Sequence, residues 1–380
     1  MNRSEEDILN AWNLEEAYKY IVHDVFLIIY FIVGVFGNVV VLIVYQVKLK
    51  KESDSRYFIP ILALVDLLAT ILRVPFELWR TILPVNFRDI NACRYLWFVV
   101  NIFTFASIYF LGIITLQRYL KVCRPFGSQL TLRWRRASLV FIFILATGTG
   151  APFVIWDEIL PIPNPALNVT GYICGADVFE VNENSDYILG FIFFISFVIT
   201  SVMLELIILN SLIARKIYTI IRNTNARRNS TKPARSNVSK EISGSTFYVT
   251  QDGTSITEAN STDFSLTNNE QEIRKEKVMV PLSNYSQPIK STSENQEPAS
   301  SRKFSYMFMV ISLAFILSYL PQIFLLFSLI NDRYFWIKIS QTETIVFKFI
   351  DHMTTVNNIV NPYVYGFFDQ KFRASAKTLC

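Results

Sequence analysis

Residues 95–124 read YLWFVVNIFTFASIYFLGIITLQRYLKVCR, and this stretch decides the fold. Its first part, residues 95–114, is almost entirely apolar and has the length that an α-helix needs to cross the hydrocarbon of a bilayer. The run ends on Gln117, Arg118 and Tyr119, where we expect the helix to leave the membrane and these side chains to meet water. The chain should therefore contain a membrane helix that ends on an uncharged amide beside a permanently charged guanidinium.

The composition of the whole chain favours a membrane protein. Of its 380 residues 52% are hydrophobic and 18% are charged, whereas about a quarter of a soluble domain is charged. Seven stretches are long and apolar enough to span, so we expect an all-α membrane protein, a seven-helix bundle. They lie near residues 21–46, 57–79, 95–117, 137–156, 187–214, 304–330 and 344–367. The last is the weakest, because it contains Lys348, Asp351 and several Asn.

The basic residues predict the orientation of these helices. The loops after the first, third and fifth helices, with the C-terminal tail, carry 27 of the 36 Lys and Arg residues. Loops rich in Lys and Arg stay in the cytoplasm, so we expect a multi-pass plasma-membrane protein with an extracellular N-terminus. The predicted parts are an N-terminus (1–20), helices one to five (21–222), a third cytoplasmic loop (223–301), helices six and seven (302–367) and an amphipathic helix with the tail (368–380).

The third cytoplasmic loop is expected to be disordered. It contains 23 Ser or Thr in 79 residues and shows little periodicity. Ser230 and Thr231 follow two arginines and fit a site for a basic-directed kinase. Phosphate there would add negative charge to the loop.

The predicted extracellular side is acidic. Residues 157–186 contain six Asp or Glu, Asp177 and Glu180 among them, and no Lys or Arg. One interpretation is an electrostatic funnel for a basic ligand. The alternative is a solvated outer surface, which is the usual role of a charged run.

The cysteines suggest two different roles. Cys93 and Cys174 both lie on the oxidising side, so we expect a disulfide between them. Cys380 follows a short amphipathic stretch and is either acylated or a free terminal thiol. With two His and no Cys-x-x-Cys motif, a structural zinc site is not expected. Asn2 and Asn168 are candidate glycosylation sites.

Asp66 lies in the middle of the second apolar stretch, where a carboxylate is costly and needs partners. Its partners could hold a cation with it, hydrogen-bond its protonated form, or form a purely structural cluster. The candidates are Asn38, Ser107, Asn357, Asn358 and Asn361.

Two prolines interrupt the last two apolar stretches. Pro321, in FILSYLPQ, follows Phe315 and Tyr319, and Pro362 lies in NNIVNPYVYGFF. Each removes a backbone hydrogen bond and should kink its helix. Two kinked helices would let the bundle switch between two packings.

Over nearly its whole length the chain resembles a rhodopsin-like (class A) G-protein-coupled receptor, in the style of neuropeptide receptors. The resemblance rests on Asn38, Asp66, Cys93 with Cys174, QRY at 117–119, Pro321 and NPYVY at 361–365, in this order and on the matching helices. It implies no enzyme activity. It also implies that Arg118 contacts the G-protein and that Tyr365 supports it.

The resemblance carries further implications for sites and partners. Asp66, Ser107 and Asn361 would form a sodium pocket, with Na⁺ as an allosteric ion and no other cofactor. The partners would be an extracellular peptide, a heterotrimeric G-protein, arrestin and kinases at the third loop, and membrane lipid, but no nucleic acid. The chain departs from the family in having Gln117 for an acid and Tyr319 for a Trp.

Two positions of the resemblance indicate which class of ligand the receptor would bind. Val100 stands where amine receptors have Asp, and Thr355 where opsins have a Schiff-base Lys, so a peptide is favoured over an amine or retinal. The acidic outer side suits a basic neuropeptide. Arg73, two turns from Asp66, either faces the ligand or extends to the outer interface. A lipid or small-molecule receptor and a transporter or ion pump are the alternatives.

Overall fold

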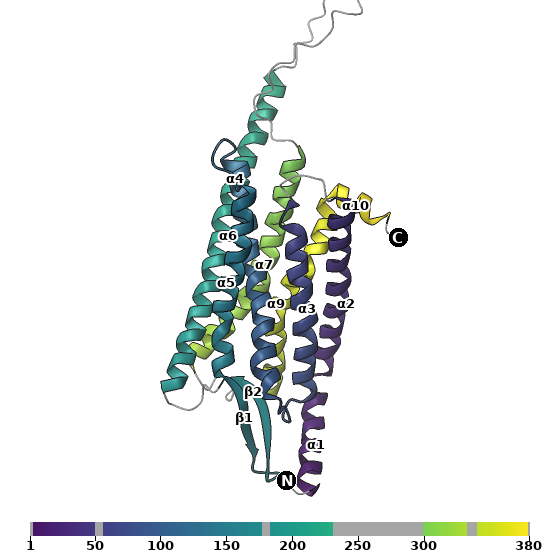
Figure 1. Ribbon diagram of the computed structural model, residues 1–380, viewed down its shortest axis with the longest axis vertical. Helices are drawn as coiled ribbons and strands as arrows, with labels where there is room; N and C mark the ends of the chain where they lie inside the picture. The colour runs from purple at the N-terminus through teal and green to yellow at the C-terminus, as the bar shows by residue number, and fades with distance from the viewer. Residues whose placement is uncertain (1–2, 50–55, 177–182, 231–298, 333–339, 379–380) are drawn as a thin grey trace, which may run out of the picture. The chain divides into compact units, whose positions relative to one another are not determined.

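The computed structural model describes residues 3–49, 56–176, 183–230, 299–332 and 340–378 (Figure 1). Within these residues seven long helices follow one another along the chain, which confirms the predicted helical architecture. Their bounds are α2 (Ile21–Ile43), α3 (Ile59–Ile82), α4 (Trp97–Cys123), α5 (Leu132–Trp156), α6 (Glu183–Ser230), α7 (Ala299–Asn331) and α9 (Gln341–Phe368). Two π-helical turns, η1 (Val44–Lys48) and η3 (Ala92–Leu96), continue α2 and precede α4.

Six of the described helices are long and apolar enough to cross a membrane. α9 is not among them, which agrees with its polar sequence. α6 runs to Ser230, so residues 223–230 are helical and not part of a disordered loop as expected. Hydropathy marks only the apolar part of a helix, and the Arg, Ala and Asn of this segment permit helix beyond it. Most of the predicted third loop lies outside the described residues.

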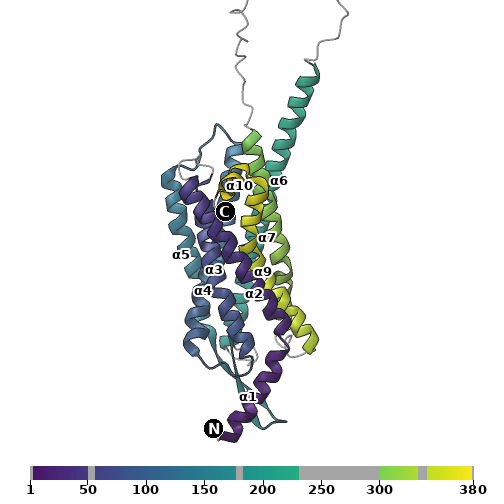
Figure 2. The same cartoon turned by 90° about the vertical axis from the view of Figure 1, so that its right-hand side faces the viewer.

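The helices pack around one apolar core. α2 contacts α3 and α9, α4 contacts α3 and α5, and α7 contacts α9. Figures 1 and 2 show these neighbours side by side. The core includes side chains of α4, α6, α7 and α9, and it contains Phe110, Leu206, Phe315 and Tyr365. Large apolar residues such as Phe36, Ile144, Phe197 and Phe324 are exposed on the helices, as expected where lipid is the solvent.

A β-hairpin lies at one end of the helices, which we name the hairpin end (Figure 1). β1 (Asp157–Asn164) pairs antiparallel with β2 (Val169–Ala176). Gly171 of β2 packs so closely that a Cβ there would lie 2.6 Å from the carbonyl oxygen of Val85 and 2.9 Å from the ring of Trp12. The hairpin was not expected from the sequence, which showed only an acidic segment there.

The N-terminal segment forms a helix that contacts the hairpin end. α1 (Arg3–Tyr18) buries Leu9, and Asn13 donates to the carbonyl oxygen of Ile82 at 2.9 Å while accepting from the amide of Val85 at 3.3 Å. Its neighbours are β2 and α3. This helix was not predicted, because its sequence is polar and its ordering depends on these tertiary contacts.

The opposite end, named the α10 end, contains the predicted short amphipathic helix. α10 (Gln370–Ala376) buries Phe372 and exposes Lys371 and Arg373. Asp369 caps it by accepting from two backbone amides of its first turn. The same carboxylate accepts from Tyr45 at 2.9 Å and pairs with Arg56 at 3.1 Å, so it ties α10 to η1 and to the start of α3.

Candidate functional site

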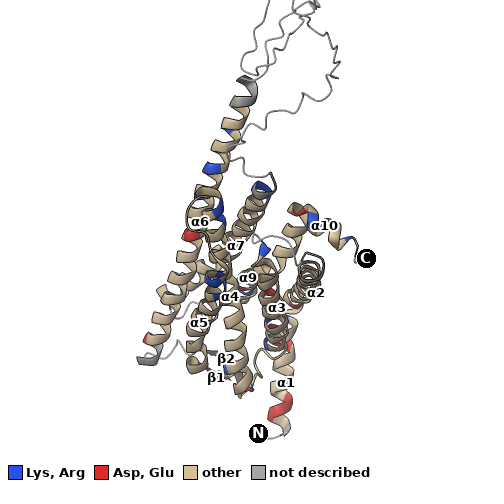
Figure 3. Cartoon of the chain, turned by 45° about the horizontal axis from the view of Figure 1, so that its top comes forward, with Lys and Arg blue, Asp and Glu red and all other residues tan. Residues whose placement is uncertain are grey.

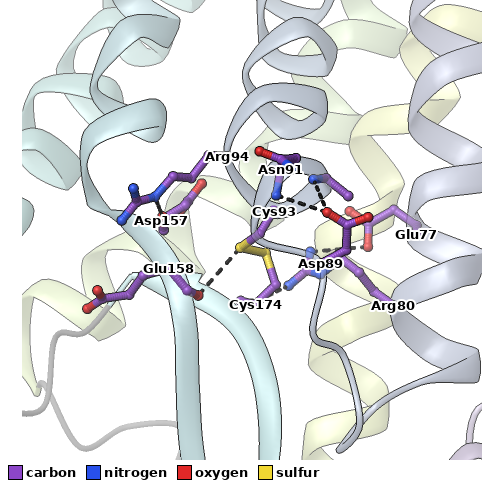
Figure 4. The surroundings of a disulfide bond; sticks show 10 residues. Glu77, Arg80, Asp89, Asn91, Cys93, Arg94, Asp157, Glu158 and Cys174 are labelled. Atoms are coloured by element: carbon purple, nitrogen blue, oxygen red, sulfur yellow. Dashed lines mark hydrogen bonds and ion pairs between the residues drawn. A yellow bond between two sulfur atoms is a disulfide. The ribbon is translucent and has the colours of Figure 1, made fainter.

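The predicted disulfide is present and fixes the hairpin against η3. It joins Cys93 of η3 to Cys174 of β2 (Figure 4). Beside it, the Nε of Arg94 donates to the carbonyl oxygen of Asp157 at 2.7 Å, as Figure 4 shows. These two links hold both strands over the start of α4.

The carboxyl group of Asp157 is buried at the start of β1. Burial raises its pKa to about 7, and the charges of Arg80 and Arg94 only partly oppose this rise. One of its oxygens, Oδ2, has no hydrogen-bond partner. The carboxyl group therefore changes its charge near neutral pH.

A cavity of about 560 Å³ lies at the hairpin end, between the helices and β2. Aromatic rings make up much of its lining, namely Tyr20, Phe87, Trp97, Phe105, Phe153, Trp156, Phe191 and Tyr319. The charged or titratable residues in its lining are Arg73, Glu77, Arg80, Asp157, Lys348, Asp351 and His352. An apolar cavity of this size with a few polar groups is typical of a ligand site.

Glu77 is the centre of a buried charged cluster in this lining. Its Oε2 pairs with Arg80 at 3.3 Å and lies 3.4 Å from Nε2 of His352. His352 also contacts His23 at 3.1 Å, so the two histidines of the chain meet between α2 and α9. Sequence analysis missed this cluster, because its members lie on three separate helices and no local motif connects them.

Of the four residues predicted to contact the ligand, Arg73 lines the cavity and Val100 does not. Arg73 lines the cavity and is 7% exposed, with its guanidinium 5.8 Å from the ring centre of Trp97. Val100 does not line the cavity. It packs inside the bundle, and its neighbours Asn101 and Thr104 on α4 line the cavity instead. Asp177 and Glu180 lie outside the described residues.

The structure brings the predicted polar cluster together around Asp66. Ser107 donates to one oxygen of the carboxylate at 2.6 Å and Asn361 to the other at 2.7 Å. Asn357 donates to Ser107 at 3.3 Å, and Asn38 donates to the carbonyl oxygen of Asn358 at 2.9 Å. All these groups are buried, so the cluster connects α2, α3, α4 and α9 without water-exposed polar atoms.

Three buried amide oxygens of this cluster have no hydrogen-bond donor within the part of the chain that the structure describes. They are the Oδ1 atoms of Asn38, Asn357 and Asn361. Buried acceptors are normally satisfied, so each unmatched oxygen needs an explanation. Together with the Asp66 carboxylate they form an oxygen-rich, singly acidic set of the kind that a hard cation prefers.

The residues that end the opening stretch are buried, and the prediction that they meet water is wrong. Gln117 and Arg118 are each 2% exposed, and Tyr119 is half-buried. The Arg118 guanidinium lies 4.7 Å from the ring centre of Phe308 and 5.4 Å from that of Phe304. Side chains of α7 therefore cover the charge that the sequence placed in water.

The other predicted switch residues lie in the core. Tyr365 is fully buried, and its hydroxyl has no partner. Phe315 and Tyr319 stack with ring centres 4.5 Å apart, and Tyr319 also lines the cavity. Pro321 and Pro362 lie inside α7 and α9, which continue through them, and the predicted kinks stay predictions.

The predicted modification sites are mostly outside the described residues, as Asn2, Thr231 and Cys380 are. Asn168 is exposed in the hairpin turn with φ of 49°. Asn tolerates this left-handed conformation better than most residues. Ser230 is the last residue of α6.

Comparisons with known proteins agree with this architecture. The family described as "7 transmembrane receptor (rhodopsin family)" matches residues 37–365. The neuromedin U receptor homolog nmur-2 of Caenorhabditis elegans is 26% identical over 145 residues, 36% of this chain and 35% of that protein. The type-1 angiotensin II receptor B of Rattus norvegicus is 29% identical over 208 residues, 52% of this chain and 55% of that protein. The type-1 angiotensin II receptor of Homo sapiens is 28% identical over 149 residues, 38% and 41% of the two chains. The chain thus spans about a third to just over half the length of these relatives.

Proposed function

Because the chain belongs to the rhodopsin family of seven-transmembrane receptors, we propose that it transmits the binding of an extracellular peptide to a heterotrimeric G-protein. The family consists of receptors and not of enzymes. One observation carries the proposal. The ligand-sized cavity lies at the hairpin end, while Arg118 is covered at the α10 end, and α4 and α7 extend to both.

We propose that the hairpin end faces the outside of the plasma membrane and the α10 end the cytoplasm. Figure 3 shows acidic residues on α1 and basic residues on α10 and the start of α7. This distribution supports the orientation, because Lys and Arg collect on the cytoplasmic side. It also supports arrestin, kinases and inner-leaflet lipid as partners of that side.

A basic neuropeptide fits the cavity better than an amine or a lipid. The cavity is large, and its lining carries three carboxyl groups and three basic groups, so a peptide with charges of both signs can pair with it. The carboxyl groups are those of Glu77, Asp157 and Asp351, and the basic groups are those of Arg73, Arg80 and Lys348. Two of the relatives described above are named as receptors for neuromedin U and angiotensin II. A lipid or other small molecule is the second candidate, because aromatic rings line much of the cavity.

The Asp66 cluster fits a bound Na⁺. The residues that would hold it are Asp66 and the unmatched amide oxygens of Asn38, Asn357 and Asn361. The ion would neutralise the buried carboxylate and match the amide oxygens. It would thereby stabilise the packing in which α2, α3, α4 and α9 share this cluster.

The cytoplasmic switch is the covered Arg118. In the present packing Phe304 and Phe308 of α7 lie over its guanidinium. G-protein contact requires α7 to move so that Arg118 becomes accessible, while Tyr365, whose hydroxyl lacks a partner, supplies a new hydrogen bond. A ligand that binds the open packing more tightly shifts the population toward it.

The test is a G-protein dissociation assay in transfected cells, using a broad library of basic peptides and a matched panel of lipids and amines. We expect a peptide to activate the receptor. Arg118→Gln is the matched variant, because it should keep surface expression and peptide binding but lose the G-protein response. A response to lipids alone would replace the peptide with the second candidate, and no response to either panel would contradict the proposal.

A further inference from the structure

Arg73 of α3 is a buried cation in the cavity lining that forms no ion pair with a described acidic residue. It is 7% exposed, and its Nε has no hydrogen-bond acceptor. Within the described residues no Asp or Glu forms an ion pair with it. A buried charge is costly unless a counter-charge or several hydrogen bonds compensate it. The guanidinium can therefore accept a negative group, because no described residue supplies one within ion-pair distance.

The nearest candidate counter-ion, Glu77, is shared with other cations. Its Oε2 pairs with Arg80 and lies beside His352, and the charge of Arg73 acts on it more weakly than either. Of the other acids of the cavity, Asp157 acts on Arg80 and Arg94, and Asp351 acts on Lys348 and on Tyr319. Glu77 thus faces the guanidiniums of Arg73 and Arg80, the imidazole of His352 and the ammonium of Lys348. Of the two guanidiniums, that of Arg73 interacts with it more weakly and can accept a further anion.

Two neutral groups in the same lining also have unmatched atoms. The hydroxyl of Tyr319 and the amide oxygen of Gln322 are buried and have no hydrogen-bond partner among the described residues, and the charge of Arg73 acts on Tyr319. Arg and Tyr offer donors, whereas the amide oxygen of Gln offers an acceptor. A carboxylate with a neighbouring backbone N–H matches this set, and the last residue of a peptide carries both.

The aromatic lining makes this recognition selective. Trp97, Phe105 and Tyr319 line the cavity with Arg73 and give it apolar walls. Charge-assisted hydrogen bonds are strong in such surroundings, and Arg binds a carboxylate with two parallel bonds. A neutral amide offers only one oxygen and no charge.

We propose that the end of the ligand inside the cavity carries a free carboxylate, bound by Arg73 with Tyr319 and Gln322. This inference rests on the proposed function and specifies its ligand: a peptide with a free C-terminal carboxylate and an apolar last side chain, not an amidated one. The basic part of the peptide then lies toward Glu77, Asp157 and Asp351.

The inference can be tested before the natural ligand is known. The purified full-length receptor in detergent is titrated with N-acetyl-L-phenylalanine or with N-acetyl-L-phenylalaninamide, and thermal unfolding is followed. A compound that binds the folded state raises the unfolding temperature. We expect the acid to bind at least tenfold more tightly than the amide. Arg73→Gln should abolish this preference, and Arg73→Lys should keep part of it.

Arg88→Gln is the matched control, because Arg88 is exposed and lies over the ring of Tyr172 outside the cavity lining. It should keep the full preference for the acid. If the wild-type receptor bound N-acetyl-L-phenylalanine and its amide equally tightly, this result alone would overturn the inference. An unchanged preference in Arg73→Gln would overturn it too. An amidated peptide that activates the receptor as well as its free acid would contradict the carboxylate but leave the proposed function intact. If no peptide activated the receptor but N-acetyl-L-phenylalanine still bound more tightly than its amide, the proposed function would be contradicted and the carboxylate site would stand.

Discussion

The contact between Arg118 and Phe308 can be tested by replacing the phenyl ring with an apolar side chain that has no π face. The guanidinium lies 4.7 Å from the ring centre, and both side chains are buried. A desolvated cation–π contact is worth about 2 kcal/mol, against about 0.5–1 kcal/mol at a surface. Phe308→Leu keeps most of the apolar contact and removes the quadrupole. We therefore expect it to destabilise the closed packing, in which α7 covers Arg118, by about 1–2 kcal/mol. This changes the ratio of closed to open receptors by a factor of roughly 5–30.

The assay is ligand-independent G-protein activation in transfected cells, normalised to surface expression. We expect basal activity to rise in Phe308→Leu and to rise further in Phe308→Ala, which also leaves a cavity. The control is Tyr306→Leu, because Tyr306 is on the same helix but exposed. Basal activity equal to that of the wild type in both Phe308 variants would refute the idea that this ring holds Arg118 in the closed packing.

Three further predictions concern other parts of the switch and the hairpin. Gln117→Asp should lower basal signalling, because an acid beside Arg118 forms charge-assisted bonds about twice as strong as those of an amide; equal or higher activity would count against this. Asp369→Asn should cost about 1–3 kcal/mol of stability, since it weakens the bonds to Tyr45 and Arg56 and leaves a buried cation, and a thermal-unfolding comparison with Glu15→Gln at an exposed position of α1 measures it. Because the pKa of Asp157 is raised to about 7 in the folded state, its contribution to stability is full below its unfolded pKa and is lost as pH rises toward and through 7. Asp157→Asn should therefore lose less stability between pH 5 and pH 8 than the wild type does, and parallel unfolding curves for the two would exclude this role.

The sequence predicted those features that depend on whether a residue is surrounded by lipid or by water. Each long apolar run became a helix, because lipid leaves the backbone no other way to satisfy its polar groups. The Asp66 cluster was predicted residue by residue, since a carboxylate in an apolar helix must find the few other polar groups at its depth.

Features that depend on packing between distant segments were missed. α1 owes its position to Asn13 and Leu9 at the hairpin end, and nothing in its own sequence indicates these contacts. The pair of His23 and His352 requires that α2 and α9 lie side by side. Arg118 was placed in water because charge normally seeks water, but two phenyl rings some 190 residues away cover it.

A single helix connects the cavity with the cytoplasmic switch. Tyr319 lines the cavity and Phe308 covers Arg118, and both belong to α7. The two positions are 11 residues apart, which corresponds to about 17 Å of helix at 1.5 Å per residue. Pro321 cannot donate to the carbonyl oxygen of Leu317, so the turn that carries Tyr319 is weakened, whereas the segment from Phe308 to Leu317 contains no proline. We therefore expect a ligand that displaces Tyr319 to change the bend of α7 at this turn, and the uninterrupted segment from Phe308 to Leu317 to move Phe308 relative to Arg118. Leu313→Pro, at an exposed position between the two sites, should interrupt this segment. We expect the variant to keep peptide binding in the cavity and to lose peptide-stimulated G-protein activation.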